Sequence, residues 1–399
     1  MTGAWSFAYD TLNRVLTAQT PSTWGVSFTN GGNGAAGIDA WGNLIQTSSV
    51  SGTNSLAMSV NQQVNANNQF TMNGYAYDAA GNVLDDGPNN GCVTNSQPTT
   101  YAWNAEDQMT CAAGVTYTYD GDGERVEKSS GTMYWGGGPG DALAESDLSG
   151  NLTSEYIFFN GKRIARRDVS GAVYYYFSDH LGSSNVVTNS AGVIQNESDY
   201  YPYGGESQIA NALPSQHYKF TDKERDSESG NDYFGARYYN SAMGRFMSPD
   251  WSAKVEPVPY SKLDDPQSLN LYAYVLNHPL SLVDADGHVP GPDRFGCSEG
   301  QKDCNTAQQK AKQPISKDTL ITVLYHALGN LTPDPNAKPG AAGSAEDLSN
   351  ARVATAEVIL TKYSNHTAKP GTTVESDKFT SAEKKLSKMV IRLQLKRFA

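Results

Sequence analysis

The sequence YTYDGDGERV, at residues 117–126, predicts a β-hairpin. Side chains alternate between the two faces of a strand, so Tyr117 and Tyr119 lie on the same face. Asp120 can accept hydrogen bonds from the backbone of the turn that follows, and Gly123 can adopt a positive φ at no steric cost. A second strand then returns from Arg125.

Altered copies of this unit recur through the first half of the chain. The closest, YAYDAAGNVL, occupies residues 75–84, and weaker copies begin at Tyr9 and Tyr101. In YIFFNGKRI, at residues 156–164, the turn shortens to Asn160-Gly161, which is a strong hairpin signal. A single hairpin is unstable alone, so the copies are expected to pair edge to edge into a long sheet.

The composition also favours many short strands. The 399 residues include 23 Tyr and 38 Gly, and Tyr favours strands whereas Gly favours tight turns. Residues 21–70 fit the repeat poorly and leave two interpretations, irregular strands or a loop. No apolar run approaches the roughly 18 residues that cross a bilayer, and the first residues lack the basic and apolar parts of a signal peptide. We therefore expect a soluble chain without membrane insertion, whose export would depend on a longer parent or on a dedicated machinery.

Charge divides the chain near residue 288. Residues 1–288 carry a net charge of −17, whereas residues 289–399 carry +5. In the basic part, hairpin signals stop and three capped amphipathic stretches begin near Ser316, Ser344 and Thr380, which predicts a mainly α domain. The basic face of its last stretch, residues 384–397, is either a solvated surface or a nucleic-acid contact.

The four cysteines form no CxxC motif and no zinc-ligand spacing. We expect them to be bystanders, with a Cys297–Cys304 disulfide as the alternative. No metal or cofactor is predicted.

Residues 175–288 contain an ordered series of short motifs. It begins with Asp179-His180-Leu181-Gly182-Ser183, continues through Gly235-Ala236-Arg237-Tyr238-Tyr239 and Ser248-Pro249-Asp250, and ends with Asp284-Ala285-Asp286-Gly287. The series resembles the RHS-repeat-associated core domain, and the hairpin unit resembles the YD repeat of RHS proteins and teneurins. Asp265-Pro266 predicts the start of a short helix with Leu269, Tyr272 and Leu276 on one face, which ends near Asn277.

The resemblance implies a mainly β fold with three parts. Residues 1–174 are expected to form YD-repeat hairpins in a curved, incomplete shell, because the hairpins are too few to enclose a cargo. Residues 175–288 form the core domain, with a short helical plug that closes one end of the sheet. Residues 289–399 occupy the place of the family's variable C-terminal effector.

The resemblance also implies self-cleavage just past the Asp-x-x-Gly motif, by two aspartates and an arginine. Matched motif by motif, these are Asp250, Asp284 and Arg237, and the cut falls between His288 and Val289. Two adjacent carboxylates share one proton, so one can act as an acid while the other remains a base. An arginine beside them can hold one carboxylate ionised.

This sequence departs from the family pattern at three positions near that site. Trp251 and Ala285 replace common prolines, and His288 stands where an apolar residue such as Leu usually precedes the cut. Asp286 is the alternative second carboxylate. Without self-cleavage, Asp250 would cap a turn and Asp284 would begin one.

Other polar residues are assigned structural roles. His180 and His278 lie in turn-like sequence with no nucleophile nearby. Asp179 and Asp226 are expected to be turn or cap residues, and Glu224 and Arg225 a solvated charge pair.

Two classes of function remain. In the first, the chain is the end of a bacterial RHS shell that encapsulates a C-terminal toxin, its own cargo, and releases it by self-cleavage. Candidate partners of such a polymorphic toxin are an upstream shell segment, a secretion machinery and an immunity protein, with nucleic acid a candidate for the C-terminal domain alone. In the second, the chain is a non-enzymatic structural or adhesive YD-repeat fragment.

Overall fold

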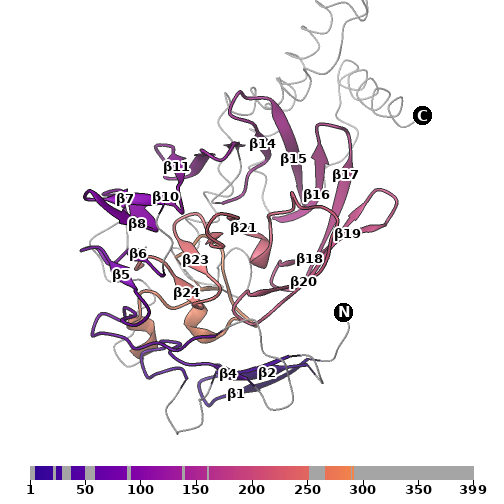
Figure 1. Ribbon diagram of the computed structural model, residues 1–399. Coiled ribbons are helices and arrows are strands. Elements are labelled where there is room, and N and C mark those ends of the chain that lie inside the picture. The colour runs from indigo at the N-terminus through magenta and orange to yellow at the C-terminus, as the bar shows by residue number, and fades with distance from the viewer. Residues whose placement is uncertain are drawn as a thin grey trace, which may run out of the picture. The chain divides into compact units, whose positions relative to one another are not determined.

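The structure is a computed structural model (Figure 1). It describes residues 5–20, 24–28, 37–49, 59–87, 91–136, 140–159, 161–250, 266–288 and 290–291. The chain divides into two compact units, Met1–Ala311 and Lys312–Ala399, and every described residue belongs to the first. The helices predicted after residue 289 lie outside the described residues.

The predicted turn chemistry repeats along the chain. The Asp120 carboxylate accepts hydrogen bonds from the backbone N–H groups of Asp122 (2.9 Å) and Glu124 (3.0 Å), and Gly123 has a φ of +86°. In the same pattern, a side-chain oxygen accepts hydrogen bonds from the backbone N–H groups two and four residues later. It recurs at Asp10, Asp39, Asn65, Asn104, Asp147, Asp179 and Asn189. Each such turn returns the chain antiparallel to itself.

Twelve strands form one antiparallel sheet in which sequence neighbours pair in order from β9 to β20. Their bounds are β9 Tyr101–Trp103, β10 Met109–Ala112, β11 Val115–Tyr119, β12 Arg125–Lys128, β13 Thr132–Trp135, β14 Ala144–Ser146, β15 Leu152–Phe159, β16 Lys162–Asp168, β17 Val173–Ser178, β18 Ser184–Asn189, β19 Ile194–Tyr200 and β20 Glu206–Asn211. Within the described residues, the two ends of this sheet do not pair with each other. The predicted open arrangement of hairpins is confirmed.

The N-terminal residues add smaller antiparallel sheets. A four-stranded sheet contains β1 Ser6–Tyr9, β2 Val15–Gln19, β3 Gly25–Ser27 and β4 Ser48–Ser49, and two pairs follow, β5 Ala76–Tyr77 with β6 Val83–Asp85 and β7 Cys92–Thr94 with β8 Gln97–Thr99. Between β3 and β5, isolated bridges Ile38↔Leu44 and Val64↔Phe70 flank the turns at Asp39 and Asn65. Two turns of the repeat type therefore lie inside the segment that fitted the repeat poorly.

The core domain after β20 folds into short elements that lie between β5–β11 and β14–β20 (Figure 1). We call residues 213–288 the plug. Its elements are η1 Phe220–Asp222, β21 Glu224–Arg225, β22 Asp232–Tyr233, β23 Tyr238–Asn240, β24 Arg245–Phe246, η2 Pro266–Leu269, η3 Val275–Asn277 and β25 Val283–Asp284, the last paired with β26 Pro290–Gly291.

The predicted helix of the plug is two separate 3-10 turns, η2 and η3, instead of one continuous helix. Leu276 has a φ of +52°, in the left-handed region, so it cannot continue a helical stripe from Leu269 and Tyr272. The predicted cap, Asp265, lies outside the described residues.

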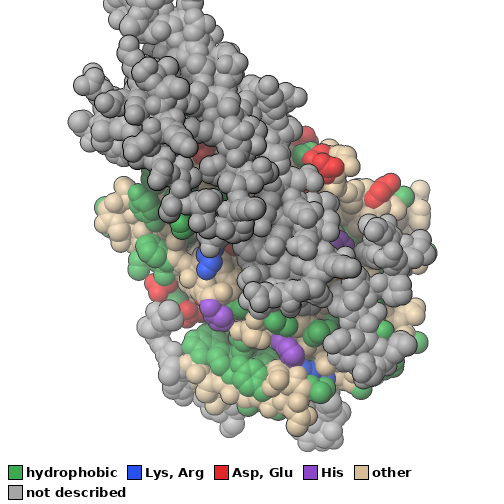
Figure 2. Space-filling model, turned by 180° about the vertical axis from the view of Figure 1, so that it is seen from behind, with side chains coloured by type: hydrophobic (Ala, Val, Ile, Leu, Met, Phe, Trp, Pro, Cys, Tyr) green, Lys and Arg blue, Asp and Glu red, His purple; other side chains and the backbone are tan. Residues whose placement is uncertain are grey.

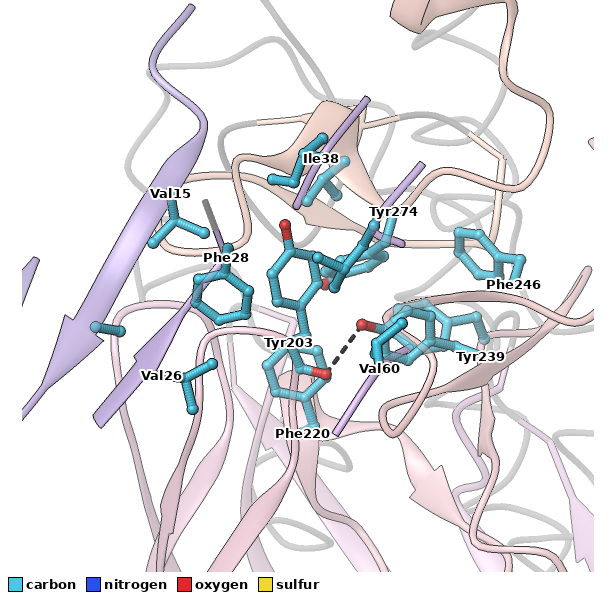
Figure 3. Packing of buried hydrophobic residues seen from close by; sticks show 14 of the residues in the cluster. Val15, Val26, Phe28, Ile38, Val60, Tyr203, Phe220, Tyr239, Phe246 and Tyr274 are labelled. Atoms are coloured by element: carbon cyan, nitrogen blue, oxygen red, sulfur yellow. Dashed lines mark hydrogen bonds between the residues drawn. The ribbon is translucent and has the colours of Figure 1, made fainter. Parts of the chain in front are cut away.

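Aromatic side chains fill the main core, and they come from segments far apart in the sequence (Figure 3). Tyr203, Phe220, Tyr239 and Tyr274 are each about 1% exposed or less, and the Tyr239 hydroxyl donates a hydrogen bond to the Tyr203 carbonyl (2.9 Å). Most ring pairs in this cluster are tilted or edge-to-face, and Phe220 stacks on Tyr239, which are arrangements that aromatic quadrupoles favour. The core therefore fastens the plug to the N-terminal strands that supply Val15, Val26 and Phe28.

A buried ion cluster fastens the plug to the large sheet. Arg125 contacts Glu224 (2.7 Å) and Asp226 (2.8 Å), and Lys128 contacts Asp226 (2.9 Å). The predicted solvated pair of Glu224 and Arg225 is wrong, because Glu224 is 6% exposed and points to Arg125. Asp226 begins the predicted turn through its backbone, which is hydrogen-bonded to Gly230 (2.7 Å) and Asn231 (2.8 Å), whereas its carboxylate neutralises two cations. These charged side chains are buried away from water, so the loss of one would leave its partners charged without compensation.

A second polar contact joins β14 to the plug. Glu145 accepts hydrogen bonds from the Tyr218 hydroxyl (2.9 Å) and contacts the His217 ring (2.8 Å). Burial alone would raise the pKa of Glu145, but the charge and hydrogen bond of His217, the hydrogen bond of Tyr218 and the charge of Arg163 together lower it to about 2.

Cys92 and Cys111 form a disulfide between β7 and β10, with their Cα atoms 5.9 Å apart. The prediction that these two cysteines are bystanders is therefore wrong. Nothing in their spacing marks them, because only the packing of β7 against the sheet brings them together. Cys297 and Cys304 lie outside the described residues.

Candidate active site

Arg237 is the centre of the candidate site. It lies in the loop between β22 and β23, is 4% exposed, and its guanidinium lies over the Phe246 ring at 3.7 Å. The backbone of this loop is closed by a hydrogen bond from the Phe234 N–H to the Arg237 carbonyl (2.9 Å). A buried guanidinium stacked on a ring keeps a fixed orientation, so its N–H groups point in defined directions.

Both predicted aspartates contact one nitrogen of this guanidinium. Arg237 Nη2 lies 3.2 Å from Asp250 Oδ2 and 3.5 Å from Asp284 Oδ2. Asp250 and Asp284 are 3% and 1% exposed. The structure therefore brings together three side chains that are separated by up to 47 residues.

The backbone around Asp250 is held by the same arginine. The Leu271 carbonyl accepts hydrogen bonds from Arg237 Nη1 (3.0 Å) and from the Asp250 N–H (2.9 Å). One carbonyl thus sets the position of the carboxylate relative to the guanidinium.

The Asp-x-x-Gly segment is anchored at both ends. Asp284 Oδ1 accepts a hydrogen bond from the Gly287 N–H (2.7 Å), and Arg237 Nε donates to the Gly287 carbonyl. Lys223 donates to the Ala285 carbonyl (2.7 Å) in between. This lysine was missed in the sequence, where nothing but its place within a quoted motif distinguishes it. Arg237 and Lys223 therefore hold in place the segment that carries Asp284 and leads to His288.

Each carboxylate uses its second oxygen on this segment. Asp284 Oδ1 holds Gly287, whereas Asp250 Oδ1 lies 2.7 Å from Nδ1 of His288, the residue before the predicted cut. His288 was named in the sequence as the cleavage position, but its contact with Asp250 was not foreseen. Val289 lies outside the described residues.

Asp286, the alternative second carboxylate, is placed differently. Its Oδ1 accepts a hydrogen bond from the His288 N–H (3.1 Å), and its own carbonyl accepts one from Ala236 (3.0 Å). It is half-buried, whereas Asp284 contacts Arg237 directly. The geometry favours Asp284 as the partner of Asp250.

The electrostatics of the site separate the titrating groups. Burial raises the pKa of Asp284 to about 6; the nearby Asp286 and Asp250 carboxylates add to the rise, and Arg237 and His288 oppose it. A carboxyl group of this kind can carry a proton near neutral pH.

The other histidines that the sequence singled out have structural contacts. His180 Nε2 lies 2.9 Å from the Leu280 carbonyl, and His278 Nε2 lies 2.9 Å from the Leu12 carbonyl. Figure 2 shows histidine side chains at the surface beside hydrophobic ones on the face opposite to that of Figure 1. Asp179 forms the predicted turn, with its carboxylate on Leu181 and Ser183.

In the described part of the chain, no group of three or more His, Cys, Asp and Glu side chains is arranged to hold a metal ion. Nor does this part contain a helix with the length and apolar character that a membrane span requires.

No protein-family model matches the sequence. Over 245 residues, 57% of the chain, it is 28% identical to the tRNA3(Ser)-specific nuclease WapA of Bacillus spizizenii. Over 121 residues, 29% of the chain, it is 33% identical to the toxin subunit YenC1 of Yersinia entomophaga. The matches span only 10% and 11% of these relatives. The crystal structure of TcdB2-TccC3-Cdc42 shares the fold, with a TM-score of 0.50 and 23% identity over 71% of this chain and 15% of that one.

Proposed function

Since this chain is an RHS/YD-repeat protein, we propose that it forms the terminal part of a bacterial toxin-delivery shell and cuts its own backbone after His288. The cut releases residues 289–399, an effector-like cargo, from the sheet and plug. Toxin names among the similar proteins support the delivery role. The cargo is basic and residues 1–288 are acidic, so electrostatic attraction favours enclosure of the cargo by this segment within a longer shell.

The observation that carries the proposal is the shared contact of two buried carboxylates with Arg237 Nη2. Two carboxylates so placed cannot both ionise at ordinary cost, so the pair holds one proton. A dyad of this kind supports hydrolysis by general acid and general base catalysis. A purely structural role would be equally served by one ion pair.

The reaction has a simple proton balance. One carboxylate takes a proton from water as the oxygen attacks the His288 carbonyl carbon, and the other gives its proton to the carbonyl oxygen. The C–N bond to Val289 then breaks as the first carboxylate gives its proton to the nitrogen. The second carboxylate takes a proton from a hydroxyl of the tetrahedral intermediate, which leaves a new carboxyl group on His288. The dyad returns to one shared proton.

The test is intact-mass spectrometry of the purified full-length chain. We expect the 43.0 kDa chain to split between His288 and Val289. Asp250→Asn and Asp284→Asn should each abolish the split, because either amide removes the shared-proton pair. Arg237→Lys should slow it about 100-fold, because an ammonium cannot hold two carboxylates and two carbonyls in one plane.

Asp179→Asn is the matched control. An Asn side chain still accepts the two turn hydrogen bonds at this position, so cleavage should continue at the wild-type rate. Cleavage that survives both dyad substitutions would refute the aspartyl mechanism. A folded wild-type chain that stays intact would favour the structural or adhesive alternative.

A further inference from the structure

The residue before the predicted cut touches one of the two carboxylates. His288 Nδ1 lies 2.7 Å from Asp250 Oδ1, and the other oxygen of Asp250 lies 3.2 Å from Arg237. Among the described residues, Asp284 forms an ion pair with Arg237 alone, and its other oxygen accepts the Gly287 N–H. The two carboxylates are therefore electrostatically unequal.

His288 can exchange protons with solvent although it contacts a buried group. Its side chain is 44% exposed, whereas that of Asp250 is 4% exposed. The charged groups that act on it are Asp250, Arg237, Asp284 and Asp286. Three of these four are acidic, and Asp250 is hydrogen-bonded to the ring.

We propose that His288 is a positioning residue of the self-cleavage reaction: its imidazole holds Asp250 ionised, so that Asp250 is the base and Asp284 the acid. This inference rests on the proposed function. The family pattern has an apolar residue at this position, so a contact between a histidine and Asp250 would be a feature of this chain and not of the family pattern.

The direction of the electrostatics agrees with this assignment. Burial opposes the charged form of His288, but the hydrogen bond and charge of Asp250 raise the pKa of His288 above its ordinary value. Asp284, which is buried and has a raised pKa, keeps the shared proton. Arg237 lies closer to Asp250 than to Asp284, as expected if Asp250 carries the negative charge.

The first test is the pH profile of self-cleavage. Loss of the imidazole lets Asp250 take up a proton at higher pH, which moves the acidic limb upward. It also removes a charge that lowers the pKa of Asp284, which moves the alkaline limb upward. In His288→Leu, the profile should therefore shift about one pH unit to higher pH.

Two further variants separate charge from packing. His288→Gln keeps a hydrogen-bond donor but no charge, so its shift should be smaller than that of Leu. His180→Gln, at an exposed histidine elsewhere, should leave the profile unchanged. A His288→Leu profile that is lower at every pH but not shifted would overturn the inference and leave the proposed function standing.

The second test needs no cleavage. In the Asp284→Asn chain, which should stay intact, the His288 ring can be titrated by NMR after nitrogen-15 labelling of histidine, with its signals assigned by their loss in His288→Gln. We expect a titration point above the ordinary value of about 6.5, which falls when Asp250→Asn is added. An unchanged titration point refutes the inference. A wild-type chain intact at every pH refutes the reaction itself, and the titration still reports whether the contact exists.

Discussion

At Gly287, the addition of a single methyl group should slow self-cleavage by more than its effect on folding stability explains. The φ of Gly287 is +89°, and a Cβ there would lie 3.0 Å from the Arg237 backbone nitrogen and 3.3 Å from Phe234 Cβ. In Gly287→Ala, the left-handed conformation costs about 1–2 kcal/mol. The close contact is with backbone, which no rotamer change can relieve, so either the Asp-x-x-Gly segment or the Arg237 loop must move.

Gly171 provides a matched control with the same strain and no contact. Its φ is +87°, and nothing lies within 4 Å of a Cβ built there. Gly171→Ala should therefore lose about 1–2 kcal/mol of unfolding free energy, and Gly287→Ala should lose more, because its Cβ also meets backbone. Only Gly287→Ala displaces the segment between Asp284 and His288, and a misplacement of about 1 Å costs a reaction about 100-fold in rate.

Two measurements decide the matter. Urea unfolding gives the stability of each variant, and a time course of intact mass gives its cleavage rate at a pH where both remain folded. We expect a stability loss in both variants and a rate loss confined to Gly287→Ala. Wild-type cleavage in Gly287→Ala, or an equal slowing in Gly171→Ala, would refute the claim that this segment is held in register by its contact with Arg237.

Two predictions concern stability alone. Asp226→Asn leaves Arg125 and Lys128 with less compensation in a buried cluster and should cost about 3 kcal/mol in urea unfolding, whereas Glu155→Gln, in a partly exposed ion pair, should cost less than about 1 kcal/mol; equal losses would contradict this. Glu145, with a pKa lowered to about 2 in the folded chain, contributes stability that is complete above about pH 4.5 and is lost as the pH falls toward 2, so Glu145→Gln should flatten unfolding free energy against pH in that window. A slope that is unchanged in the variant would show that other carboxyl groups are responsible.

The sequence by itself predicted the hairpins, and its resemblance to the RHS core pointed to the candidate site residues. A turn such as Asp120–Gly123 is stabilised by hydrogen bonds within five residues, so its whole cause lies in the local sequence. The turn at Asp39 has the same local signal, since Asp39-Ala40-Trp41-Gly42-Asn43 matches Asp78-Ala79-Ala80-Gly81-Asn82. It was missed because no tyrosine pair precedes it. Arg237, Asp250 and Asp284 followed from motif order.

Only the tertiary structure decided which partners these residues meet. Glu224 and Arg125 are 99 residues apart, and neither has a local signal for burial, so Glu224, which was predicted to be solvated, became part of a buried cluster only when the plug packed against β12. The Cys92–Cys111 bond likewise depends on the packing of separate strands. The choice of Asp284 over Asp286, and the contact of His288 with Asp250, depend on how the chain turns at Gly287 against Arg237. Such contacts are non-local, so their geometry arises from packing and cannot be read from the order of residues along the chain.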